Sequence, residues 1–273
     1  MNWHNVITIA RKDIKEVREN KSIWIPMIVV FLIFSVVLPV IFILAILHTA
    51  ESELMTEPMK TFFQNMPTSL TNQIAGMTLE QQMIYLAVTY FFAPLFLILP
   101  LMVSNIFAVD SFAGEKERKT IEALLYTPTT DKELIMGKLL AAFVPSQIIA
   151  WIGFVIYSIV VNLTGYPTFG RIFFPGLLWV VLMLWIVPAV SLFGLGVSVL
   201  VSIKAKSFQE AYQISGSVVL PFIAILLMQI FGVIYLSIWF TLVLGLLFWV
   251  VDWIILYIGT KKFRRGEIIA NMV

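Results

Sequence analysis

Residues 84–138 read IYLAVTYFFAPLFLILPLMVSNIFAV and then DSFAGEKERKTIEALLYTPTTDKELIMGK. The first part, residues 84–109, contains no Asp, Glu, Lys or Arg. It exceeds the roughly 20 apolar residues with which a helix crosses a bilayer core about 30 Å thick. The second part, residues 110–138, is rich in charges of both signs. The stretch therefore predicts a membrane-spanning helix followed by a polar loop.

The composition of the whole chain also favours a membrane protein. Of its 273 residues, 60% are hydrophobic and 12% are charged, whereas soluble domains are about half apolar and about a quarter charged. A net charge of +2 gives no support for nucleic-acid binding. The chain has no cysteine, which excludes disulfides and thiolate metal sites.

Five further segments are long and apolar enough to cross a bilayer. We therefore expect an all-α polytopic membrane protein with six transmembrane helices within residues 23–259. Only residues 233–238, which carry no charge, separate the last two segments, so a hairpin that turns before the outer surface is an alternative there. The six predicted spans are residues 23–47, 84–109, 139–163, 176–201, 214–232 and 239–259.

The basic residues are distributed unevenly between the predicted loops. Of the 18 Lys and Arg residues, all but Lys60 and Arg171 lie in the N-terminal segment, in the loops after spans two and four, or in the C-terminal tail. Loops rich in Lys and Arg stay in the cytoplasm, so both termini are expected there, and an even number of spans agrees. The predicted compartment is the cell membrane, in particular a prokaryotic plasma membrane.

This orientation divides the chain into three parts. An amphipathic cytoplasmic helix is expected in residues 1–22, the six-span domain in residues 23–259, and a basic cytoplasmic tail in residues 260–273. Within the six-span domain, residues 48–83 form an outer loop that is expected to hold one or two short helices at the membrane interface. Residues 110–138 form a cytoplasmic loop.

The N-terminal segment has apolar residues at helical spacing and basic residues on the rest of the helix surface. One interpretation is a helix that rests on anionic membrane lipid, and another adds a protein partner for part of that helix. The apolar positions are Trp3, Ile7, Ala10, Ile14 and Val17, and the basic positions are Arg11, Lys12, Lys15 and Arg18.

The loop after span two carries a second amphipathic pattern. Pro128 ends a short helix in this loop, because the residue before a proline is disfavoured in the α conformation. Thr130 or Asp131 can cap the helix that follows. The loop is therefore expected to present a short charged helix, from Glu115 to Leu125, held between two spans. Its apolar patch has i, i+3, i+4 spacing and consists of Ile121, Leu124 and Leu125.

The run GEKERKTIEALL at residues 114–125, the pair Thr127-Pro128 and the run ELIMGK at residues 133–138 resemble the signature loop of type-two ABC permeases. These are the membrane subunits of exporters for drugs, antibiotics, polymers and sodium. Members of the family have six spans, cytoplasmic termini, an N-terminal amphipathic connecting helix and a coupling helix after span two. Many members have glycine where this chain has Lys119, so this position departs from the pattern.

The resemblance implies a non-catalytic permease subunit that forms the substrate pathway of an ATP-driven exporter as a dimer. The chain has no G-x-x-x-x-G-K-[ST] phosphate-binding loop, so ATP and Mg would be bound by a separate ATPase. We expect this chain to hold no cofactor, metal or catalytic residue. The expected partners are two ATPase subunits, a second copy or a homologous permease, and membrane lipid, but no nucleic acid. The residues expected to couple to the ATPase are Glu115, Glu117, Arg118, Thr120, Ile121, Glu122, Leu124, Leu125 and Pro128.

Polar residues inside the predicted spans are candidates for the substrate pathway. Asp252 lies nine residues before Lys261, which places it about 14 Å inside the inner boundary of the bilayer. Ionisable groups at such depth are often functional. Asn105 and Gln229 are weaker candidates, because amides in spans usually bond to neighbouring helices. A structural hydrogen bond is the alternative interpretation for Asp252 as well.

Two other classes of function stay open at this stage. An ATP-independent channel or immunity-type membrane protein would have no ATPase partner, and it would not account for the loop after span two. An intramembrane enzyme needs several catalytic groups at one depth, and only Asp252 is available. The sequence does not indicate which substrate is transported.

Overall fold

The computed structural model describes the chain except for residues 50–62, 64–65, 121–128 and 263–273. The described residues form a bundle of long helices without strands. Six of the helices are long and apolar enough to cross a membrane. This confirms the predicted all-α class and the number of spans.

The first span consists of α2 (Lys21–Leu32), η1 (Ile33–Val37) and α3 (Leu38–His48), and it follows α1 (Trp3–Glu19). The second consists of α7 (Leu79–Leu86), η2 (Ala87–Phe91), α8 (Phe92–Val109), η3 (Asp110–Gly114) and α9 (Glu115–Glu117). The third is α11 (Asp131–Phe169), and the fourth joins α12 (Leu177–Val181), η4 (Leu182–Ile186) and α13 (Val187–Lys204). The fifth joins α14 (Phe208–Gly216), η5 (Ser217–Val219) and α15 (Leu220–Ile230), and the sixth is α16 (Ile238–Lys262).

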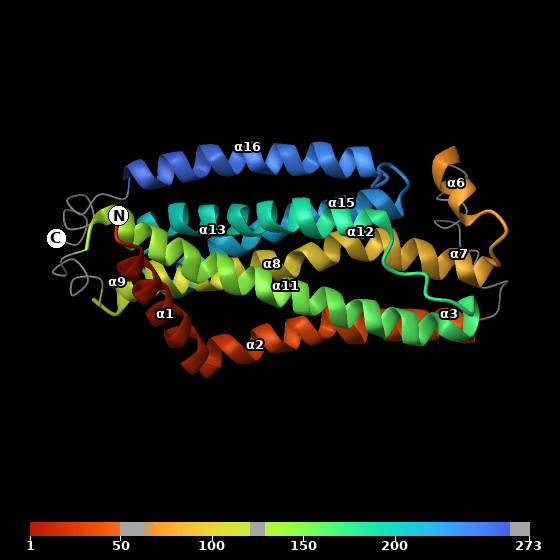
Figure 1. Cartoon of the computed structure of the whole chain (residues 1–273), viewed down its shortest axis with the longest axis horizontal. Helices are drawn as coiled ribbons and strands as arrows, with labels where there is room; N and C mark the ends of the chain where they lie inside the picture. The colour runs from red at the N-terminus through yellow and green to blue at the C-terminus, as the bar shows by residue number, and fades with distance from the viewer. Residues whose placement is uncertain (50–62, 64–65, 121–128, 263–273) are drawn as a thin grey trace.

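The bundle has two distinct ends (Figure 1). One end, here the α1 end, contains α1, α9 and the start of α11. The opposite end, here the α6 end, contains α6 (Thr68–Ile74), α7 and α12. α6 is a short helix within the predicted outer loop, most of which lies outside the described residues.

Spans two and three are longer than predicted. Span two runs over Leu79–Glu117 and span three over Asp131–Phe169, so the helices extend into both predicted loops. At Leu79 the helix begins early because Thr78 forms a capping box with Gln81. Hydropathy marks only the part of a helix that lies in hydrocarbon, and charged residues beyond it continue the same helix.

Span two lies at the centre of the bundle. In its most apolar stretch 78% of the residues are buried, against 17–28% in spans one, three, five and six. α8 packs against α2, α11, α13, α14 and α15. α13 approaches α8 closely at Gly194, where a Cβ atom would lie 2.8 Å from Oγ of Ser104.

A π-helical turn precedes a proline in three of the spans: η1 before Pro39, η2 before Pro94 and η4 before Pro188. Proline has no N–H group, so a carbonyl in the preceding turn loses its helical donor. Inside a membrane such a carbonyl needs another donor, because water does not reach it.

Around this turn of span two, three successive carbonyls accept hydrogen bonds from other spans. The Val88 carbonyl accepts a hydrogen bond from the Tyr157 hydroxyl at 2.9 Å, and the Thr89 carbonyl accepts one from Nε1 of Trp179 at 2.9 Å. The Tyr90 carbonyl accepts one from Nε2 of Gln229 at 3.2 Å. Trp179 also stacks on Tyr157 with ring centroids 4.9 Å apart. The irregular turn of span two is therefore held by spans three, four and five.

Candidate functional site

The C-terminal end of span two contacts four other helices at the α1 end of the bundle. The centre of these contacts is a buried ion pair in which Nζ of Lys138 lies 2.6 Å from Oε2 of Glu115. Nζ of Lys138 also lies 3.3 Å from Oδ2 of Asp13 and donates to the Ser111 carbonyl at 2.7 Å. The Lys138, Glu115 and Asp13 side chains are 0%, 1% and 2% exposed. A buried charge without a partner costs several kcal/mol, so these three groups depend on one another.

Lys12 adds a second ammonium group to this cluster. It bonds to Oε1 of Glu115 and lies 3.3 Å from carboxylate oxygens of both Asp13 and Glu16. Partial burial acts to lower the pKa of Lys12, but the hydrogen bond and charge of Glu115 outweigh it, so the pKa lies above its ordinary value. Lys12 is therefore charged at neutral pH.

Arg118 closes the cluster on the side of span two. Its Nη2 lies 2.7 Å from Oε1 of Glu16, and its Nη1 donates to Oδ1 of Asp110 at 3.0 Å. Arg118 therefore connects α1 to the end of span two and also bonds back to Asp110, eight positions earlier in the same span.

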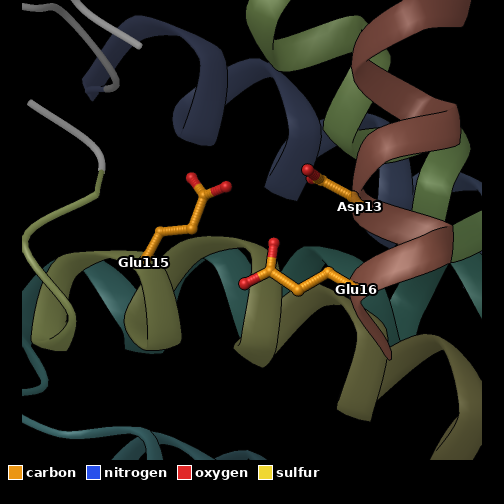
Figure 2. A group of neighbouring side chains, drawn as sticks. All are labelled: Asp13, Glu16 and Glu115. Atoms are coloured by element: carbon orange, nitrogen blue, oxygen red, sulfur yellow. The ribbon is translucent and has the colours of Figure 1, made fainter. Parts of the chain in front are cut away.

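The three carboxylates Asp13, Glu16 and Glu115 come close enough together to hold a metal ion. Their oxygens lie within 4.8 Å of one another, and Figure 2 shows Asp13 and Glu16 on α1 opposite Glu115 on α9. However, Lys12, Lys138 and Arg118 already supply positive charge to these oxygens. The ammonium and guanidinium groups thus balance the negative charge that a metal ion would otherwise balance. That the chain holds no metal stays our prediction.

Lys116 and Glu117 connect span two to the ends of two further helices. Nζ of Lys116 donates to the carbonyls of Ile203 and Ala205, at 3.3 and 3.1 Å, where α13 ends. Oε2 of Glu117 accepts a hydrogen bond of 2.7 Å from the Phe208 amide, where α14 begins. A cation at a helix C-terminus and an anion at an N-terminus both satisfy unpaired backbone groups and oppose the helix dipole.

The helix of span two ends at Lys119, which has a left-handed backbone with φ of 57°. The Thr120 amide donates to the Glu115 carbonyl at 3.0 Å and the Lys119 amide to the Lys116 carbonyl at 3.2 Å. This pair of bonds is a Schellman motif. A left-handed residue at this point favours glycine, which gives a physical reason for the glycine that many type-two ABC permeases have at the position resembling Lys119.

This helix end corrects the prediction of one short helix that starts at Glu115 and continues to Leu125. Glu115 and Glu117 belong to the last turn of span two, and the chain changes direction at Lys119. A separate short helix would have to follow this turn. The segment in which it was predicted, residues 121–128, lies outside the described residues.

Span three begins with a capping box. The Thr130 hydroxyl accepts from the Glu133 amide at 3.3 Å, and the Glu133 carboxylate accepts from the Thr130 amide at 3.1 Å. Of the two predicted caps, Thr130 and Asp131, the cap is therefore Thr130. Glu133 also accepts from the Asn2 amide at 2.5 Å and from Nδ2 of Asn5 at 3.3 Å. The start of α1 is thus attached to the start of span three.

Gly137 allows α1 to lie directly on span three. A Cβ atom on Gly137 would be 2.8 Å from Cβ of Ile9 and 3.0 Å from the carbonyl oxygen of Val6. The next residue, Lys138, reaches into the ion cluster. The Gly-Lys pair therefore combines a close helix contact with a buried charge.

The structure divides the predicted apolar face of α1 into two parts. Ala10 and Val17 are buried against the bundle, and they share this face with an acid, Asp13. Trp3 and Ile7 are 57% and 46% exposed, so they do not belong to the buried face. The apolar residues of α1 therefore do not all lie on one buried face, and the contact of this helix with lipid stays a prediction.

A family model described as ABC-2 family transporter protein matches residues 7–251. The chain belongs to the ABC-2 transporter family. The match begins in α1 and ends in α16, so it includes the whole ion cluster, the first five spans and more than half of the sixth. It confirms the resemblance to type-two ABC permeases and identifies a multi-pass membrane component of a transporter. A comparison with curated proteins finds no match.

In this ABC-2 transporter, the predicted coupling residues have different outcomes. Ile121, Glu122, Leu124, Leu125 and Pro128 lie outside the described residues. Glu115 was expected to face a partner, but its side chain is buried against Lys138. Glu117 and Arg118 are exposed in part and bond within the chain, and the Thr120 hydroxyl donates to the Glu115 carbonyl at 3.3 Å.

Several members of the cluster were not singled out from the sequence as site residues. The sequence contains a signal for one of them, Asp13, because an acid that interrupts the apolar spacing between Ala10 and Val17 indicates a buried partner. The others offered no signal, since acids and bases of a charged segment are usually solvated. They are Asp110, Ser111, Lys116 and Lys138.

The three candidate pathway residues of the transporter have separate environments. Oδ1 of Asn105 accepts from the Ser198 and Ser215 hydroxyls, each at 2.7 Å, and so joins spans two, four and five. Gln229 supports the kink of span two, as described above. Asp252 is 2% exposed, and its carboxylate has no hydrogen-bond partner among the described residues. Whether substrate passes these residues stays a prediction.

Proposed function

We propose that the chain is the permease subunit of an ATP-driven ABC exporter and that a separate ATPase docks on residues 119–130. The observation that carries this proposal is the pair between Lys138 and Glu115, at 2.6 Å. It joins the two helix ends that hold the loop, and Asp13 adds α1 to the same cluster. A displacement of this loop by the ATPase would therefore move span two, span three and α1 together.

Within this proposal the residues have two kinds of role. Ile121, Leu124 and Leu125 form the apolar contact with the ATPase, next to the charge of Glu122. Glu115 is a positioning residue, because its carboxylate is buried in the ion cluster. Pro128 and Thr130 separate the docking segment from the first turn of span three.

The assembly follows from what one chain supplies. ATP and Mg are bound by two ATPase subunits, since this chain has no phosphate-binding loop. A second copy or a homologous permease completes the pathway. The α1 end faces the cytoplasm, because the basic residues gather there. The exposed Trp3 and Ile7 of α1 then contact membrane lipid, next to the basic residues of the same helix.

The test uses ATP hydrolysis by the tagged chain after purification from its own membrane in mild detergent. Hydrolysis must come from a bound partner. Leu124→Asp combined with Leu125→Asp should leave the chain in the membrane and remove the hydrolysis. The matched control, Thr71→Asp with Asn72→Asp, places the same charges on α6 at the opposite end and should keep it.

Two results would contradict the proposal. Hydrolysis that survives in the Leu124→Asp, Leu125→Asp variant would place the ATPase elsewhere on the chain. No hydrolysis with any variant, under conditions that keep known ABC complexes intact, would favour an ATP-independent channel or immunity-type protein.

A further inference from the structure

A cavity of about 670 Å³ lies at the α6 end of the bundle, far from the ion cluster. Its walls come from α6, from the first turns of span two, from the start of α12 and from the segment that enters α16. The volume lies within the roughly 300–1,000 Å³ of small-molecule pockets. The residues that define its chemistry are Gln73, Tyr85, Tyr90, Leu177, Tyr235 and Trp239.

Among the described residues, no acidic or basic side chain lines the cavity. A charged ligand would lose its hydration there without gaining an ionic partner, which is costly. Four aromatic rings and several aliphatic side chains suit an apolar body instead. The cavity therefore selects for an uncharged molecule.

One polar position stands out on this apolar wall. Oε1 of Gln73 accepts a hydrogen bond of 2.9 Å from the Tyr90 hydroxyl and a longer one, 3.5 Å, from the Tyr85 hydroxyl. The Gln73 amide is solvent-exposed, and its Nε2 has no hydrogen-bond partner among the described residues, so this group can donate to a ligand. A hydroxyl group can both donate and accept at such a position.

The rim of the cavity opens towards the surroundings of the bundle. Trp239 and Leu177 are 78% and 65% exposed. On the opposite wall, Thr89 and Tyr90 belong to the π-helical turn that Trp179 and Gln229 support. π turns often occur at functional sites, and this one connects the cavity wall to spans four and five.

We propose that this cavity binds an uncharged amphipathic molecule. Its apolar body lies against Tyr235, Trp239 and Leu177, and its hydroxyl group bonds to the amide of Gln73. The proposal does not depend on the docking of an ATPase. The molecule is either a membrane lipid or one that the transporter carries, and the experiment below separates these two sources.

The chain has no cysteine, so single cysteines report on the cavity without interference. Ser69→Cys places a thiol on the cavity wall. Asn72→Cys, on the same helix and outside the lining, is the matched control. The rate of reaction with N-ethylmaleimide is measured with and without 1-decanol, and with decanoate and decylammonium as charged probes of equal chain length.

We expect 1-decanol to slow the reaction of Ser69→Cys at least fivefold and to leave Asn72→Cys unchanged. The charged probes should slow Ser69→Cys less than twofold. Adding Gln73→Leu should reduce the protection by 1-decanol at least threefold, with the Asn72→Cys rate as the check of folding. Equal effects on both cysteines, equal effects of all three probes, or no protection at all would each overturn the proposal.

The reaction rates with N-ethylmaleimide in lipid vesicles and in detergent identify the source of the bound molecule. If a membrane lipid occupies the cavity, Ser69→Cys is already protected in phosphatidylcholine vesicles that contain diacylglycerol, an uncharged lipid with a hydroxyl group, and becomes reactive in lipid-free detergent. If the natural ligand is a carried molecule, Ser69→Cys reacts at similar rates in both, relative to Asn72→Cys, and 1-decanol protects it in both.

Discussion

The ammonium nitrogen of Lys138, at the start of span three, lies 2.6 Å from a carboxylate oxygen of Glu115, at the end of span two. The two side chains are separated by 23 positions in sequence and are almost entirely buried. This pair brings together the two ends of the loop that resembles an ATPase-docking loop. Asp13 approaches the same ammonium group from α1 at 3.3 Å, so α1, span two and span three meet at the charge of Lys138.

Lys138→Met should destabilise the protein by about 3–5 kcal/mol, because it leaves Glu115 and Asp13 buried with less positive charge. Lys132→Met, at an exposed position on the same helix, should change stability by less than about 0.5 kcal/mol. The free energy of unfolding in mixed micelles measures both. Adding Glu115→Gln to Lys138→Met should restore part of the loss. Equal effects of the two lysine substitutions would show that the pair is not important for stability.

Gly137→Ala should loosen α1, since its Cβ would lie 2.8 Å from Cβ of Ile9. Gly216→Ala is the matched control, because a Cβ there meets nothing within 4 Å, and it should gain up to about 1 kcal/mol from helix propensity. Limited trypsin digestion measures the effect through cleavage after Arg11 and Arg18 in α1. We expect faster cleavage only in Gly137→Ala. The same cleavage rate in both variants would mean that α1 does not depend on this contact.

Lys119→Gly should leave stability unchanged or raise it slightly. Relief of the left-handed backbone gains about 1–2 kcal/mol, and the added freedom of the unfolded chain offsets about 0.4–1 kcal/mol of this. Lys15→Gly, in the middle of α1, should instead lose about 1 kcal/mol. The free energy of unfolding in mixed micelles shows whether each of the two variants gains or loses stability. A clear loss of stability in Lys119→Gly would contradict the assigned helix end.

The six spans could be predicted because hydropathy reports directly on what a bilayer requires of a helix. The ends of span two could not be predicted from hydropathy. Its last turn contains Glu115, whose charge is neutralised by Lys138, and Lys116, whose ammonium group donates to carbonyls at the end of α13. The cap at Thr130 was foreseen as one of two alternatives, because capping depends on local sequence alone.

The ion cluster was beyond prediction for a different reason. Lys138 and Asp13 are 125 positions apart, and their contact depends on how closely α1 approaches span three at Gly137. The sequence shows the charges but not which of them face inward. The loop motif drew attention to the right residues, yet Glu115 supports the loop from inside the bundle instead of touching a partner.

Trp179→Phe should cost about 1–3 kcal/mol, because it leaves the Thr89 carbonyl in span two without its donor while the ring remains. Trp151→Phe is the control, since Trp151 is 40% exposed on the surface of the bundle. Pro94→Ala returns an N–H group to the turn that follows this carbonyl. The cost of Trp179→Phe should therefore be smaller in a Pro94→Ala background. The unfolding free energies of the unchanged protein, Trp179→Phe, Pro94→Ala and the double variant form a double-mutant cycle. If the effects of the two substitutions add within about 0.5 kcal/mol, Trp179 does not compensate for the proline.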